Sequence, residues 1–133
     1  MRNNRGVVQS TLVMTVSVLT LLALAVTIAV VVKKQIDQRN NSRKSAQDAA
    51  EYGMMIALKK IEENPRWQEG FSNVKYRDCL YDVKIEKIGD NVFKAQATGE
   101  CNNVKKRVVC TYQLIEQDGV MKPKTVNGGW EYQ

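Results

Sequence analysis

Histidine is missing from this 133-residue sequence, and proline occurs only twice. Histidine is the side chain most used for acid and base catalysis near neutral pH, and it is the commonest metal ligand, so its absence argues against both kinds of site. The three cysteines, Cys79, Cys101 and Cys110, form no CxxC pair and no metal-ligand spacing. The sequence therefore predicts no catalytic residue, no metal site and no cofactor, and favours a protein that is not an enzyme.

Charged residues are missing from the 26 residues Val7 to Val32, which are mainly Val, Leu, Ala and Thr. A helix of this length measures about 39 Å, more than the ~30 Å hydrocarbon core of a bilayer. A cleaved secretory signal fits less well, because its apolar region usually has about 7 to 15 residues. A buried core helix also fits less well, because about 18 apolar residues already indicate a spanning helix. The segment predicts a single transmembrane helix.

The charges around this segment leave its orientation open. Arg2 and Arg5 precede it. A larger basic group follows it: Lys33, Lys34, Arg39, Arg43 and Lys44. By the positive-inside rule, this count places the following domain in the cytoplasm. The cysteines favour the opposite side, because they are compatible with an oxidising compartment.

A polar connector and a second helix are expected over residues 33–64. Ile36 is the single aliphatic residue in 33–45, and Asn40, Asn41 and Ser42 are unfavourable inside a helix, so the helix is expected to loosen there. Small and apolar residues then recur at helical spacing: Ala46, Ala49, Ala50, Gly53, Met54, Ala57, Leu58 and Ile61. This stripe predicts packing on the sheet that follows, on another helix of a filament, or on both. Pro65 is expected to end the helix at Asn64.

Residues 65–133 predict a small antiparallel sheet. Tyr81, Val83 and Ile85 alternate with polar residues, as in a half-buried strand. Further strands are expected over 92–97 and 104–115, with a possible fourth near Trp130 in an otherwise loop-like tail, residues 117–133. The predicted fold class is thus α+β, a long N-terminal transmembrane and amphipathic helix packed on a three- to four-stranded antiparallel sheet.

The strand register predicts which cysteines pair. A three-residue loop at 89–91 places Ile88 opposite Val92, Ile85 opposite Ala95, and Cys79 opposite Cys101. Facing residues approach to about 4.5 to 5.5 Å, within reach of a disulfide. The expected bridge is therefore Cys79 to Cys101, with Cys110 left buried.

Two surface features allow weaker functional hypotheses. The net charge of +6 is spread over both halves of the chain, and the run Lys105, Lys106, Arg107 is more typical of a solvated strand face than of a DNA site. Ordered base contacts need aromatic platforms beside the charges, and only Tyr112 is near. DNA is therefore an unfavoured partner. Four aromatic residues either line a small groove or plug the ends of the core: Trp67, Phe71, Trp130 and Tyr132.

The order of these features resembles the type IV pilins and type II secretion pseudopilins. The stretch Met1 to Gly6, MRNNRG, looks like a prepilin leader. The stretch 46–58, AQDAAEYGMMIAL, is similar to the segment that follows the anchor in PilX-like minor pilins. Ala97, Thr98 and Gly99, followed by Arg107 and Val108, look like the strand-turn-strand near their C-terminus.

The resemblance implies a complete assembly route. A prepilin peptidase would cleave residues 1–6 between Gly6 and Val7, and the new terminus at Val7 would be methylated. The implied organisation is a leader (1–6), a transmembrane helix (7–32), a connector with an amphipathic helix (33–64) and a β domain (65–133). Before assembly the subunit would sit in the inner membrane, in contact with lipid, with its C-terminal domain periplasmic or extracellular. The inner-membrane assembly platform would then transfer it to other pilin subunits in a pilus or pseudopilus.

One departure refines this expectation. The fifth residue of the mature chain would be Thr11, where major pilins carry a glutamate that neutralises the amino terminus of a neighbouring subunit. A carboxylate in lipid is costly unless it is paired, so its absence removes that contact and favours a minor subunit. The competing hypothesis is a single-pass membrane protein whose outer domain binds a ligand or partner and never polymerises.

Overall fold

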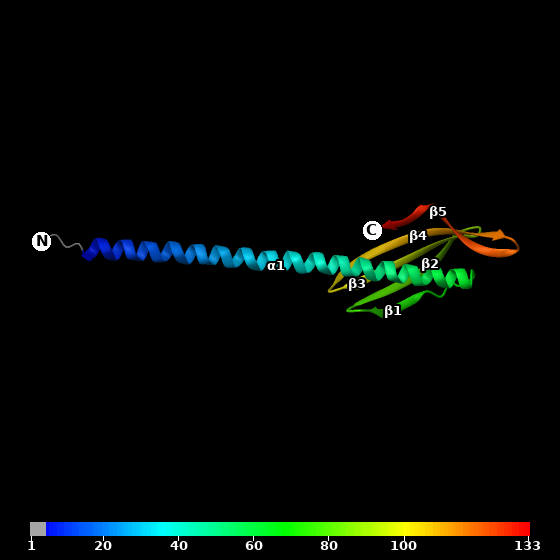
Figure 1. Ribbon diagram of the computed structural model, residues 1–133, viewed down its shortest axis with the longest axis horizontal. Helices are drawn as coiled ribbons and strands as arrows, with labels where there is room; N and C mark the ends of the chain where they lie inside the picture. Colours follow the sequence, from blue (N-terminus) through cyan, green and yellow to red (C-terminus); the bar gives the residue numbers. More distant parts are fainter. Residues whose placement is uncertain (1–4) are drawn as a thin grey trace. The chain divides into compact units, whose positions relative to one another are not determined.

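A computed structural model of the chain describes residues 5–133. Over this range it contains one helix, α1 (Arg5–Glu63), followed by five strands (Figure 1). The strands are β1 (Phe71–Tyr76), β2 (Cys79–Gly89), β3 (Val92–Cys101), β4 (Val104–Gln117) and β5 (Val120–Tyr132). The chain divides into two compact units, one ending at Gln38 and one beginning at Arg39, and each is described by itself.

Helix α1 is continuous through residues 33–45, so the loosening expected there does not occur. Neither Gly nor Pro lies between Val7 and Tyr52, and nothing in the sequence therefore interrupts the backbone hydrogen bonds. Ser42 is buried, and its hydroxyl accepts a hydrogen bond of 3.1 Å from the side-chain amide of Asn102. Ser42, a polar residue of the expected connector, is thus part of the folded domain. The helix ends at Glu63, as Pro65 predicts.

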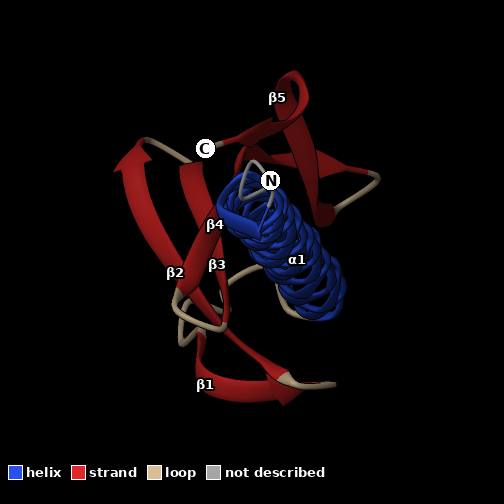
Figure 2. Ribbon diagram, turned by 90° about the vertical axis from the view of Figure 1, so that its left-hand side faces the viewer, coloured by secondary structure: helices blue, strands red, loops and turns tan. Residues whose placement is uncertain are grey.

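The second unit is an α+β domain whose sheet has the strand order β1-β2-β3-β4-β5, with every neighbouring pair antiparallel. Over the described residues this makes five strands, so the predicted three or four is too few. β5 pairs with β4 in two stretches, 120–125 and 130–132, and is counted here as one strand. Figure 2 shows the sheet curving around the C-terminal part of α1, with β1 and β5 at its two edges.

The sequence does not predict β1 and predicts β5 only near Trp130, because each of these edge strands breaks the rules of regular strands. In β1 the register shifts between Phe71 and Val74, and Asn73 has a positive φ of 51°, so its side chains do not alternate. In β5, Pro123 and the pair Gly128 and Gly129 are ordinary loop signals. An edge strand tolerates proline because one side of its backbone has no ladder partner.

The core lies between α1 and the sheet, as the helical stripe predicts. The stripe residues are buried apart from Leu58, which is partly buried against the core. From the sheet, alternate residues of each strand meet them: Tyr81 and Val83 of β2, Phe93, Ala95 and Ala97 of β3, and Val108, Cys110, Tyr112 and Leu114 of β4. The inward face predicted for β2 is confirmed, because Tyr81 and Val83 are buried and Ile85 packs against the core.

The turn between β2 and β3 differs from the prediction at one residue. Gly89 pairs with Val92, and the register shifts between Lys87 and Gly89, so Ile88 does not face Val92. The bulge absorbs the extra residue, and Ile85 still pairs with Ala95 and Tyr81 with Gly99. The turn between β3 and β4, at Asn102 and Asn103, has φ of 48° and 64°, as two-residue hairpin turns require.

Candidate functional site

The apolar run of α1 is the first candidate functional surface. Its large side chains are 46% to 70% exposed, with Val32 and Met14 at the two limits. Its threonine hydroxyls and the hydroxyl of Ser17 donate hydrogen bonds to carbonyls one turn earlier in the same helix, as in Thr15 to Thr11 at 2.9 Å and Thr27 to Ala23 at 2.8 Å. These hydroxyls therefore need no water, and the helix is long and apolar enough to cross a membrane.

The predicted processing site lies at the beginning of the described part of α1. Gly6 and Val7 are both helical, and a side chain added at Gly6 would meet no atom within 4 Å. Residues 1–4 of the predicted leader lie outside the described residues. The Thr11 hydroxyl, at the place where a major pilin has its glutamate, donates to the carbonyl of Val7 at 2.8 Å and to that of Val8 at 3.0 Å.

The closest approach of α1 to the sheet lies at Gly99 of β3. A Cβ built on Gly99 would overlap the carbonyl oxygen of Ala46 and would lie 2.8 Å from the amide nitrogen of Ala50. A Cβ at Gly53 would lie 2.7 Å from the Tyr81 ring. The stripe of small residues on α1 thus packs on a glycine of the sheet, and the backbone of the helix lies directly against the backbone of β3. A glycine inside an alternating strand is the sequence signal for such an approach.

Cys79 and Cys101 form a disulfide, with 4.6 Å between their Cα atoms. Cys79 is the first residue of β2, and Cys101 is the last residue of β3. This is the pair that the register of β2 and β3 brings together. The bridge links two neighbouring turns of one end of the sheet.

Cys110 is a free cysteine and is fully buried. Burial raises the pKa of its thiol, because an apolar surrounding disfavours the thiolate. Reactive cysteines have the opposite character, with a lowered pKa and an accessible sulfur. Cys110 therefore has the character of a packing residue. Among the described residues, no group of three or more His, Cys, Asp or Glu side chains could hold a metal ion.

Tyr112 is a buried residue whose hydroxyl has no hydrogen-bond partner. Its ring stacks on Phe93 with 5.4 Å between the ring centroids. Burial, and to a smaller extent the neighbouring Cys110, raises the pKa of Tyr112 to about 12. A buried hydroxyl without a partner costs about 1 to 3 kcal/mol.

Replacement of Tyr112 by phenylalanine is expected to raise the free energy of unfolding at pH 7 by about 1 kcal/mol, because it removes this unpaired hydroxyl. Above its unfolded pKa near 10 the tyrosine ionises only in the unfolded chain, so the wild type loses stability as the pH rises from 10 to about 12. In Tyr112→Phe this decline is expected to be shallower. Urea unfolding in detergent, followed by tryptophan fluorescence at several pH values, measures both effects.

The control is Tyr76→Phe, a half-buried ring on β1 that stacks on Tyr52. Its expected change is below about 0.5 kcal/mol. A loss of more than 1 kcal/mol in Tyr112→Phe would show that the hydroxyl has a partner.

The basic run and the aromatic residues do not form a common site. Lys105 pairs with Glu100 at 3.7 Å, and the backbone of Arg107 exchanges hydrogen bonds of 2.8 and 3.1 Å with Gln133. Trp67 contacts Phe71 beside β1, with 5.1 Å between the rings, whereas Trp130 lies in β5 opposite Cys110. β1 and β5 are opposite edges of the sheet, so the two aromatic pairs belong to different edges.

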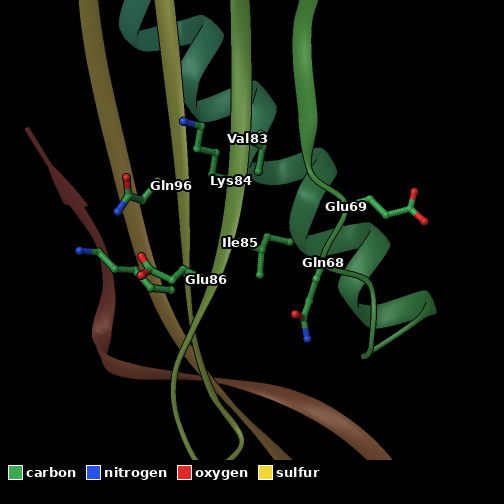
Figure 3. A pocket seen from close by; sticks show the side chains of 8 residues that line it. Gln68, Glu69, Val83, Lys84, Ile85, Glu86 and Gln96 are labelled. Carbon is green, nitrogen blue, oxygen red and sulfur yellow. The ribbon is translucent and has the colours of Figure 1, made fainter.

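A groove of about 340 Å³ lies beside β2, where β1 no longer covers it (Figure 3). β1 pairs with β2 only as far as Val83, and the rest of β2 pairs with β3 alone. The groove has a mixed lining with both signs of charge: Gln68, Glu69, Val83, Lys84, Ile85, Glu86, Lys94 and Gln96. This lining does not single out a ligand.

Comparison of the chain with protein-family models, with curated proteins and with solved structures found no match.

Proposed function

We propose that the chain is a structural subunit of a type IV pilus or of a type II secretion-like filament, in the manner of a minor pilin or pseudopilin. Its function is packing, and it catalyses no reaction. The subunit waits in the membrane, and assembly moves its apolar helix from lipid into the interior of the polymer. The C-terminal domain stays on the outside of the filament.

The observation that carries the proposal is the dual character of α1. One helix bears an uncharged apolar run, Val7 to Val32, and further along a stripe of small residues that binds it to an antiparallel sheet. A helix that must be stable both in lipid and against other helices needs apolar side chains and internally satisfied hydroxyls, and this run has both. The tight backbone contact at Gly99 holds helix residues Ala46 and Ala50 against the sheet of the C-terminal domain.

Thr11 supports a minor rather than a major subunit. A hydroxyl that donates to the carbonyls of its own helix offers no negative charge to a neighbour's amino terminus. Such a subunit does not depend on a partner placed above it in the filament. A position at the tip, or occasional positions along the shaft, fit this property.

The competing proposal is a single-pass membrane protein whose outer domain binds a ligand or partner and that never polymerises. Fibres sheared from cells and separated from membranes distinguish the two. The pilin proposal predicts that a part of the protein is recovered with the fibres. Recovery in the membrane fraction alone, in cells that carry fibres, would support the competing proposal.

A further inference from the structure

The two ends of the C-terminal domain differ in charge. The near end comprises helix residues 39–46 and two eight-residue segments, 74–81 and 99–106, which are centred on the turns 77–78 and 102–103. The far end comprises helix residues 56–63 and two eight-residue segments, 87–94 and 115–122, which are centred on the turns 90–91 and 118–119. The antiparallel order of the strands places each pair of turns at one end of the sheet (Figure 1).

The near end carries seven basic and two acidic side chains, whereas the far end carries five of each. The near-end basic residues are Arg39, Arg43, Lys44, Lys75, Arg77, Lys105 and Lys106. All of them are exposed except Lys106, which is partly exposed. The two near-end acids are Asp78 and Glu100, and Glu100 is engaged by Lys105. The near end therefore has a net excess of five positive charges, seven basic minus two acidic side chains.

Two contacts bring together the three segments that carry these basic residues. Asn102 donates to the Ser42 hydroxyl, which sets the β3–β4 turn beside residues 39–46 of the helix. The disulfide between Cys79 and Cys101 sets the β1–β2 turn beside the β3–β4 turn. The guanidinium of Arg77 lies 5.3 Å from the centre of the Tyr76 ring. The cluster is thus built by the fold from three separate segments of the chain.

The cluster is also tethered close to the predicted bilayer. Arg39 follows Val32, the last residue of the apolar run, by seven residues. A helix rises about 10 Å over this length, and even a fully extended chain spans only about 25 Å. The headgroup layer occupies roughly the first 5 to 8 Å outside the hydrocarbon core. Along a continuous helix, Arg39 therefore lies within about one Debye length of the phosphates.

From this charge and this tether we infer that the near end binds anionic phospholipid headgroups at the membrane surface. The inference rests on the membrane anchor in the proposed function but not on polymerisation. Binding would hold the domain against the bilayer while the subunit waits, and extraction into a filament would have to break it. A basic residue near an anionic surface strengthens binding by roughly fivefold at low salt.

The test uses the full chain in detergent micelles, with phosphatidylglycerol or phosphatidylcholine added and the retained lipids counted by native mass spectrometry. The expected result is at least tenfold more phosphatidylglycerol than phosphatidylcholine, falling towards equality at 0.5 M salt. The near-end variant R43Q/K44Q/K105Q/K106Q is expected to lose most of this preference. The far-end variant K59Q/K60Q/K87Q/K122Q removes the same charge and is expected to keep it.

Three results would overturn the inference. The first is an equal loss in both variants, which would show a general effect of net charge. The second is a complete loss in K33Q/K34Q alone, which would place the lipid contact at the end of the membrane helix. The third is an unchanged lipid preference in the near-end variant together with lost binding to a 30-base-pair DNA duplex, which would make the cluster a nucleic-acid site. Extraction of the wild type from membranes by carbonate would instead contradict the anchor itself.

Discussion

Replacement of Gly99 by alanine is expected to lower the free energy of unfolding by about 3 kcal/mol or more, the upper part of the range for overpacked cores. The new methyl group would occupy the space of the Ala46 carbonyl oxygen, and the Ala50 amide lies on its other side. Both obstacles are backbone, so no side-chain rotation can relieve the overlap. The helix must instead move away from β3, which opens contacts along the whole stripe.

The measurement is denaturant unfolding of the full chain in detergent, followed by the fluorescence of Trp67 and Trp130. The matched control is Gly89→Ala, because a Cβ at Gly89 would meet only the Val92 side chain, at an ordinary 3.6 Å. Its expected change is within about 0.5 kcal/mol. Wild-type stability in Gly99→Ala would mean that the helix does not lie as close to the sheet as described here.

Replacement of Gly6 by leucine is expected to reduce the amount of the chain in sheared fibres at least tenfold. A prepilin peptidase has to accommodate the residue before the bond that it cuts, and leucine there replaces a residue with no side chain. An uncut chain also keeps Arg2 and Arg5 at the end of its apolar helix, and the interior of a polymer cannot hold these charges without partners. Immunoblots of the fibre and membrane fractions measure the effect.

Gly6 is suited to this test because a side chain added there meets nothing within 4 Å, so the substitution should not disturb folding. Ser10→Leu is the control, since it adds the same bulk to an exposed position of the same helix but lies beyond the cut bond. It should be processed normally. Equal recovery of Gly6→Leu and the wild type in fibres would argue strongly against leader cleavage.

Local patterns predicted the centre of the domain well. The alternation at Tyr81, Val83 and Ile85 and the stripe from Ala46 to Ile61 correctly identify the inward faces, because burial on one side leaves a regular period in the sequence. The register of β2 against β3 was also predictable from Leu80 to Lys87, since a slip by one residue would turn every apolar side chain outward.

The edges of the domain were not predictable in the same way. β1 contains a bulge at Asn73, and β5 contains Pro123 and two glycines, so neither strand leaves a regular period. Their pairing depends on β2 and β4, which offer open edges to any extended segment nearby. Nor does the sequence reveal that Ser42 is buried, because its partner, Asn102, lies 60 residues away in the chain.

The near-end cluster shows a similar limit for function. Lys105 and Lys106 look like an ordinary strand face when they are read alone, and Arg43 and Lys44 look like the flank of a membrane helix. Only the folded chain, with Asn102 against Ser42 and a disulfide between neighbouring turns, brings the two groups to one end of the domain.

The most direct test of the account is the mass of the amino-terminal peptide from protein recovered in sheared fibres. The account predicts a chain that begins at Val7 and carries one methyl group on its terminal nitrogen. A peptide that still includes Met1 to Gly6, from a protein found only in membranes, would contradict it.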